Sequence, residues 1–304
     1  MSKDVNVGKE KAVGKKKSGD SKPLVSIMLL NMNGKKLTKD CIDSVLRNTS
    51  YPNYEIVVVD NGSIDGSVEM LKEMQKKGVV KKLILNPKNA GYSAGVNQGF
   101  GACNGKYVYH LDNDTLVEKG WLEKAVEAAE GLSGKAGAVG SALVSKADYG
   151  KGLQGKEVVR ERPAVCGAAM MYSREALEKV GLLDAELWSP IYGEEQDWCY
   201  RARNAGFKVL ETNASRVFHI GGQDTMKSIK AIARYELLET NRIKAMLYNL
   251  SVPDMASHVP GLGLIFVNSL KSGMAPNLLK CYWNNLANWQ EVLKQRQKRK
   301  ARLF

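Results

Sequence analysis

The chain has 304 residues and a formal net charge of +13, and its hydrophobic content of 44% is near the average of soluble globular proteins. This composition excludes collagen-like, coiled-coil and wholly disordered proteins. The positive charge is concentrated at the ends, because residues 1–22 hold seven Lys and three acids, and residues 280–304 hold seven Lys and Arg and one Glu. The body between them is nearly balanced, so we expect no binding to nucleic acid.

Apolar runs alternate with amphipathic segments through the first half of the chain. Residues 1–22 are polar and aperiodic, which predicts a disordered basic tail. We predict strands at 24–31, 54–59, 80–85, 107–111 and 136–144, and helices at 37–49, 68–75, 93–103 and 116–130. Repeated strand–helix–strand units indicate an α/β fold, with a parallel sheet between layers of helices. Ligands of such sheets bind at the edge formed by the carboxyl ends of the strands.

The second half of the chain is less regular. Residues 146–163 are rich in Gly and Lys and predict an irregular segment. Strands are then expected at 164–172, 207–210 and 216–220, and helices at 174–180, 194–205 and 226–250. We therefore divide the chain into a disordered tail (1–22), one α/β domain (23–250) and a helical, basic C-terminal extension (251–304).

Several polar residues follow the predicted strands at the ligand-binding edge. Asn31 and Asp60 end the first two strands, and Asp112 and Asp114 follow the strand at 107–111. Two carboxylates two residues apart can direct oxygen ligands at one divalent cation, although Asp and Asn are also ordinary turn residues. His219 ends a later strand and suits either a structural role or a place beside such a metal.

Two further segments carry chemical groups at the starts of helices. Residues 89–95 lead into a helix of small residues, whose backbone N–H groups can bind a phosphate or whose small side chains allow close packing. Glu194, Glu195 and Asp197 begin a later helix. Acids there stabilise the helix dipole, and a carboxylate in that position can also serve as a general base. Asp197 and Arg201 have the spacing of an ion pair within a helix.

The order of these motifs resembles that of the inverting glycosyltransferases of family 2, above all the branch containing rhamnosyltransferases and galactofuranosyltransferases. The resemblance covers about residues 24–245. The matching blocks are LVSIMLLNMNG, VVVDNGSIDGS, NAGYSAGVNQG, YVYHLDNDT, CGAAMMYSREALEKVGLLDAEL, YGEEQDWCYRARNAGFKV and VFHIGG. The resemblance implies the GT-A fold, with a Rossmann-like, mostly parallel sheet flanked by helices.

The resemblance also implies roles for the motif residues. Glu195 stands at the position of the family's catalytic carboxylate, and Glu194 is its rival because the family's Glu-Asp pair is Glu-Glu here. Asp112, Asp114 and His219 would hold a divalent cation, with Asp114 the more direct ligand. The residues expected to bind the nucleotide sugar are Asn31, Asp60, Asn89, Gly91, Asn97, Asp112 and Asn113.

The implied activity is transfer of a sugar from a nucleoside-diphosphate sugar, of UDP or dTDP type, to a hydroxyl group of a glycan or lipid-linked acceptor. Mn²⁺ or Mg²⁺ would assist, and a carboxylate would act as general base. Two alternatives stay open at this point. One is a sugar-nucleotide-binding protein without catalysis, and the other is a nucleotidyltransferase, for which residues 33–36 form a poor phosphate-binding loop.

The sequence contains neither a signal-peptide pattern nor a long apolar run, so we predict a cytoplasmic location. Apolar and aromatic residues alternate with Lys and Arg in residues 261–304. This pattern is typical of peripheral contact with an anionic membrane, here on its cytoplasmic face. It equally suits helices that pack on the domain or on a second copy in a homodimer.

Overall fold

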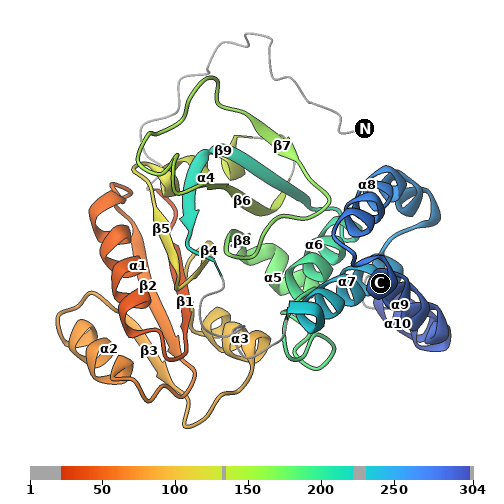
Figure 1. The fold of residues 1–304 in the computed structure, drawn as a ribbon. Helices are drawn as coiled ribbons and strands as arrows, with labels where there is room; N and C mark the ends of the chain where they lie inside the picture. The colour runs from red at the N-terminus through yellow and green to blue at the C-terminus, as the bar shows by residue number, and fades with distance from the viewer. Residues whose placement is uncertain (1–21, 132–134, 222–230, 302–304) are drawn as a thin grey trace.

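The computed structural model describes residues 22–131, 135–221 and 231–301, so the predicted tail lies outside it except for Lys22. Figure 1 shows a sheet between helices, with further helices at one side. The strands are β1 (Val25–Asn31), β2 (Tyr54–Asp60), β3 (Lys82–Leu85), β4 (Tyr107–Asp112), β5 (Thr115–Val117), β6 (Ala136–Val144), β7 (Val159–Glu161), β8 (Ala169–Ser173) and β9 (Lys208–His219). The helices are α1 (Lys35–Asn48), α2 (Ser67–Lys76), α3 (Tyr92–Ala102), α4 (Trp121–Glu130), α5 (Arg174–Val180), α6 (Glu194–Asn204), α7 (Ala231–Asn249), α8 (Val252–Lys271), α9 (Ala275–Ala287) and α10 (Trp289–Ala301).

The described strands form one sheet in the order β3-β2-β1-β4-β8-β6-β9-β5, with β7 paired to β9. Strands β1 to β4 run parallel, and so do β6 and β9. β8 lies between β4 and β6 and is antiparallel to both. The group β1 to β4 therefore points in the same direction as the pair β6 and β9, and the carboxyl ends of both groups share an edge. The predicted α/β fold, with a mostly parallel sheet between helices and a helical C-terminal part, is confirmed.

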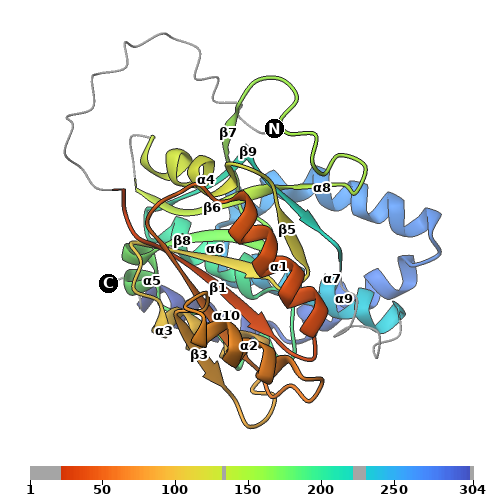
Figure 2. The same ribbon diagram turned by 90° about the vertical axis from the view of Figure 1, so that its left-hand side faces the viewer.

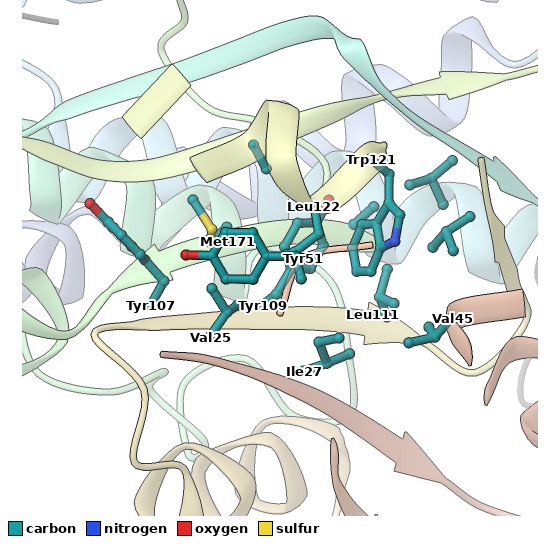
Figure 3. Close-up of a cluster of buried hydrophobic side chains, with 14 of the residues drawn as sticks. Val25, Ile27, Val45, Tyr51, Tyr107, Tyr109, Leu111, Trp121, Leu122 and Met171 are labelled. Atoms are coloured by element: carbon teal, nitrogen blue, oxygen red, sulfur yellow. The ribbon is translucent and has the colours of Figure 1, made fainter. Parts of the chain in front are cut away.

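Alternating side chains of the central strands fill a core on each face of the sheet. Val25, Ile27 and Leu29 of β1 join a cluster with residues of α1 and α4, in which the ring of Trp121 packs edge-on against Tyr109 (Figure 3). Met28, which lies between Ile27 and Leu29, points to the opposite face, where residues of α3, α5 and α6 pack with it in a second cluster. This burial on both faces explains the continuous apolar runs of the parallel strands.

The structure corrects three predicted elements. Residues 116 and 117, predicted as the start of a helix, belong to β5, and α4 begins only after Gly120, which has a φ of 79°. The two strands predicted at 207–210 and 216–220 are one strand, β9, whose pairing with β6 shifts register near Ser141. The irregular segment 146–163 includes β7, because residues 159–161 pair with β9 at the edge of the sheet.

The C-terminal helices pack on the body through a third apolar cluster. Val292 of α10 lies in this cluster with Trp188, Tyr200, Met246 and Tyr248. The residues of this cluster come from both sides of residue 250, where we predict a domain boundary. The division into domains stays a prediction. Residues 226–230 of the predicted long helix lie outside the described part. None of the described helices combines the length and apolar character needed to cross a bilayer.

Candidate active site

The parallel strands bring three predicted site residues to one edge. Asn31 pairs in register with Asp60 on β2, and Leu30 pairs with Asp112 on β4. Asn31, Asp60 and Asp112 therefore lie together at the carboxyl ends of β1, β2 and β4, where the sequence predicts the site. Figure 2 looks onto α1 and α2, with the C-terminal helices behind the sheet.

A buried hydrogen-bond network braces the ends of β1 and β2. The Asn31 amide donates to Oδ2 of Asp60 at 2.7 Å and to the Ser63 hydroxyl at 3.1 Å. Oδ1 of Asp60 accepts from the backbone N–H of Ser63 at 2.8 Å, and Oδ1 of Asn31 accepts from the hydroxyl of Thr38. Asn113 also turns toward this network, donating to Oδ1 of Asn31 at 3.1 Å. These hydrogen bonds hold the carboxyl ends of β1 and β2 in place. Direct contact of these groups with a nucleotide stays a prediction.

The loop between β3 and α3 is held by a residue to which the sequence assigns no role, Asn61. Its amide donates to Oδ1 of Asn89 at 2.8 Å and its carbonyl oxygen accepts from the backbone of Ala90. Gly91, with a φ of 91°, then begins α3 in a conformation that favours glycine. The side-chain amide of Asn97 donates to the Leu183 carbonyl, and its oxygen accepts from the Leu183 N–H. In this structure Asn97 therefore anchors the loop before α6.

Asp112, Asp114 and His219 form a cluster in which one ligand atom from each residue lies within 4.8 Å of the others. The antiparallel pairing of β5 with β9 explains it, because Thr115 is opposite His219 and the Ile220 N–H donates to the Asp114 carbonyl. His219 Nε2 lies 3.1 Å from Oδ1 of Asp114. Chain segments about a hundred residues apart thus meet at the edge.

The donor set of this cluster fits a divalent cation. Burial, together with the neighbouring Asp114 carboxylate, raises the pKa of Asp112 to about 6. The hydrogen bond with Asp114 raises the pKa of the His219 imidazole. A bound cation would relieve the repulsion between the carboxylates, and carboxylate oxygens with an imidazole nitrogen are ligands that Mn²⁺-like ions accept.

The two glutamates at the start of α6 lie in different surroundings. Glu194 is buried, with Oε2 lacking a hydrogen-bond partner among the described residues, and burial raises its pKa well above the ordinary value. Glu195 is half-buried, and its Oε1 accepts a hydrogen bond of 2.7 Å from the Tyr92 hydroxyl. Burial also raises the pKa of Glu195, whereas the Tyr92 hydrogen bond lowers it.

Glu195 lies beside the cluster of Asp112, Asp114 and His219. Its carboxylate packs against the backbone of Gly167, where a Cβ atom would collide with it. The next residue, Ala168, accepts a hydrogen bond from the backbone N–H of Asp112 at 2.9 Å. The two residues that precede β8 therefore contact both Glu195 and Asp112, which brings these two side chains near each other. Gly167 falls in a sequence block that we matched, but nothing in its pattern signalled this contact.

His110 is a further residue that the sequence analysis missed. It is fully buried on β4, its Nε2 lies 3.7 Å from Oδ1 of Asp112, and its ring packs edge-on against Tyr92. Both ring nitrogens lack a hydrogen-bond partner among the described residues, and burial lowers the pKa of the imidazole to about 4. His110 is therefore neutral at pH 7. An inward-facing His within an apolar strand gives no periodic signal.

The mostly parallel sheet, with acidic residues at its carboxyl edge, is the architecture that the resemblance to the GT-A fold implies. The sequence model of "Glycosyl transferase family 2" matches residues 26–181, which is about half of the chain. The chain therefore belongs to glycosyl transferase family 2. The matched range includes Asp112 and Asp114 and ends before Glu194, Glu195 and His219.

Curated relatives are named as glycosyltransferases. The chain is 34% identical over 108 residues to an uncharacterized glycosyltransferase of Haemophilus influenzae, a match covering 36% of this chain and 33% of that protein. It is 26% identical over 197 residues to glycosyltransferase AglE of Haloferax volcanii, covering 62% and 64% of the two chains. The chain thus spans between a third and two thirds of the length of these relatives.

Two solved structures share the fold at low sequence identity. One is a mannosyltransferase from Pyrobaculum calidifontis in complex with GDP-Man and Mn²⁺, with a TM-score of 0.61, 15% identity and 88% coverage of both chains. The other is TarS of S. aureus in complex with UDP-GlcNAc, with a TM-score of 0.56, 15% identity, and coverage of 75% of this chain and 67% of that one.

Proposed function

We propose that this family 2 enzyme transfers a sugar with inversion, from a nucleoside-diphosphate sugar to a hydroxyl group of a glycan or lipid-linked acceptor. The observation that carries the proposal is Glu195, a half-buried carboxylate held by Tyr92 beside Asp112, Asp114 and His219. The nucleotide sugars GDP-Man and UDP-GlcNAc bound to proteins of similar fold support a donor of this class. A UDP or dTDP donor is the more specific form of the proposal.

The residues divide the reaction between binding and proton transfer. Asp112, Asp114 and His219 would hold Mn²⁺ or Mg²⁺, which when bound offsets charge on the diphosphate leaving group. Glu195 accepts the proton of the acceptor hydroxyl as that oxygen bonds to the anomeric carbon and the bond to the diphosphate breaks. One displacement from the opposite face inverts the anomeric configuration. Tyr92 orients the Glu195 carboxylate through its hydrogen bond.

The surroundings favour Glu195 over Glu194 as the base. Glu194 is buried with only 1% of its surface exposed, and its raised pKa keeps it protonated over a wider pH range. Glu195 is more accessible, and the Tyr92 hydrogen bond holds down the pKa that burial raises. A base that is ionised and in reach of the acceptor is the better catalyst.

The first test is Glu195→Gln, which keeps the size of the side chain and removes its basicity. We expect donor binding to be retained and turnover to fall by about 10²–10⁴-fold, the share of general-base catalysis. Donor binding is measured by calorimetry, and turnover by release of nucleoside diphosphate in a screen of nucleotide sugars with Mn²⁺ or Mg²⁺. Unchanged turnover would remove Glu195 from the role, and Glu194→Gln would then be compared.

The second test concerns the cation. Chelation with excess EDTA should abolish transfer, and added Mn²⁺ or Mg²⁺ should restore it, because the carboxylate pair needs a positive charge to accept a diphosphate. Asp114→Asn should weaken Mn²⁺ binding, as followed by electron paramagnetic resonance without any donor. Full activity in excess EDTA would contradict a cation-assisted reaction.

These tests also separate the alternatives. A sugar-nucleotide-binding protein without catalysis would bind the donor and release no nucleoside diphosphate under any condition. A nucleotidyltransferase would release pyrophosphate from a nucleoside triphosphate instead. An enzyme that uses a lipid-linked acceptor would work at the cytoplasmic face of a membrane, which makes the outer surface of the C-terminal helices relevant.

A further inference from the structure

Helix α8 is apolar on the side that faces away from the protein. Val252, Val259, Val267 and Leu270 recur at helical spacing on one face, and all four are exposed. Ser269 is the only residue of the 20-residue helix that is fully buried. A helix that belonged to a self-contained surface would show polar residues on that face. The outer face of α8 is therefore left without a partner in the described chain.

Helix α9 repeats the arrangement with a clearer division between its faces. Leu278, Cys281 and Asn285 are buried on the inner side, where α9 packs on α7. Leu279 and Trp283 lie on the opposite side, and the side chain of Trp283 is 70% exposed. In Figure 1 the helices α8, α9 and α10 lie together at the side of the molecule opposite α1 and α2. Exposed apolar surface on consecutive helices marks an interaction surface.

The charged residues of these helices favour a negatively charged partner. Residues 252–299 contain six Lys and Arg and two acids. Arg296 and Arg299 turn inward, because they donate hydrogen bonds to the Leu247 carbonyl and to Asp197. The four lysines at positions 271, 280, 294 and 298 are all exposed. Two copies of the chain joined through this face would bring these like charges together.

We propose that the outer faces of α8 and α9 dock on an anionic lipid bilayer, with the apolar side chains in the interfacial layer and the lysines at the headgroups. Trp and Leu beside Lys are suited to this depth, since the indole ring and the lysine stem are apolar while their ends are polar. The described helices are too short or too polar to span the bilayer, so the contact is peripheral. The inference does not depend on the transferase reaction.

The test is flotation of the full-length chain with vesicles of phosphatidylglycerol and phosphatidylcholine, compared with phosphatidylcholine alone. We expect binding to the anionic vesicles that weakens at high salt. Leu286 of α9 is also exposed. Replacing Leu279, Trp283 and Leu286 together by Ser should lower bound protein by about tenfold or more. The matched control is Leu46→Ser, an apolar residue of α1 that is 43% exposed on the other side of the molecule.

A second variant and a second measurement guard against misfolding and self-association. Lys271→Gln with Lys298→Gln leaves the apolar surface intact and should reduce binding to anionic vesicles, together with its dependence on salt. Sedimentation velocity without lipid should give a monomer for every variant. The inference is wrong if wild type does not float, or if both sets of variants float like wild type. It is also wrong if wild type is a dimer that the triple variant dissociates.

Discussion

The hydrogen bond from Tyr92 and the burial of Glu195 have opposite effects on the pKa of this proposed base. Burial raises the pKa of Glu195, and the Tyr92 hydroxyl lowers it by stabilising the carboxylate. Catalysis requires the ionised carboxylate, so the rate should fall as the pH drops below this pKa. The acid side of the pH profile therefore reports directly on the contact between α3 and α6.

Tyr92→Phe should shift the acid limb of the kcat/KM profile to higher pH. Without the donor hydroxyl the carboxylate loses stabilisation, so its pKa rises and a higher pH is needed to ionise it. The profile is measured by nucleoside diphosphate release for both proteins. Tyr149→Phe serves as the control, because Tyr149 hydrogen-bonds only weakly to a backbone carbonyl at 3.5 Å. An unshifted limb in Tyr92→Phe would contradict the role of Tyr92.

The sequence could single out the charged residues of the candidate site but not the residues that contact and position them. Asp112 and Asp114 follow a strand, and a strand end is visible as the end of an apolar run. The proximity of His219 came from the family resemblance, because pairing between β5 and β9 depends on contacts distant in sequence. Tyr92 and Gly167 act through single contacts with Glu195, and such contacts leave no periodic pattern.

At the scale of elements, α3 depends on close approach to the sheet. A Cβ atom at Gly99 would lie 2.6 Å from Cγ of the buried Met28 on β1. At Gly101, in the same helix, an added Cβ would meet no atom within 4 Å. The small residues of α3, for which the sequence allowed either phosphate binding or close packing, thus include one, Gly99, that packs closely on the sheet.

Gly99→Ala and Gly101→Ala should change stability in opposite directions. We expect the first to lower the free energy of unfolding by about 1–3 kcal/mol through overpacking. The second should raise it by up to about 1 kcal/mol, because Ala is the better helix former. Urea denaturation followed by circular dichroism measures both. Equal effects of the two substitutions would show that α3 does not need the close approach.

The elements that the sequence predicts well are those with a dense local signal. β1, β2 and β4 are continuous apolar runs, and each was located within about one residue of its observed bounds. β5 was hidden because Leu116 and Val117 continue the apolar spacing of α4, and only the left-handed conformation of Gly120 separates the two. Local spacing also carries no information on the antiparallel insertion of β8 between β4 and β6.

At the scale of the whole molecule, one arginine joins the C-terminal helix to the helix of the proposed base. Arg299 of α10 donates to Oδ1 of Asp197 at 2.7 Å, and Arg201 donates to Oδ2 at 2.8 Å. Asp197 is fully buried two residues after Glu195. The sequence suggested only the Asp197–Arg201 pair, and it left open whether the C-terminal basic helices contact a membrane, the domain or a second copy. Part of these helices contacts the domain, through Arg299.

Removing this arginine should make the protein both less stable and more sensitive to acid. Burial alone would raise the pKa of Asp197, but the two guanidinium groups lower it below its ordinary value of 3.8. A lowered pKa stabilises the folded state above that value, and the stabilisation is lost as the pH falls toward the folded pKa. Arg299→Met takes away one of the two charges and raises the folded pKa, so acid unfolding should begin at a higher pH. Removing one partner of a buried pair also costs about 3 kcal/mol at pH 7.

The neighbouring exposed residue provides the control for this prediction. Lys298→Met removes the same charge from the same helix at an exposed position, and its effect on stability should stay within about 0.5 kcal/mol. Urea titrations at pH 7 and acid titrations, both followed by tryptophan fluorescence, measure the two variants. If Arg299→Met matched Lys298→Met in both titrations, α10 would not support the helix that carries Glu195. If only Arg299→Met is impaired, the C-terminal helices belong to the same cooperative unit as the proposed active site, and a boundary at residue 250 would divide that unit.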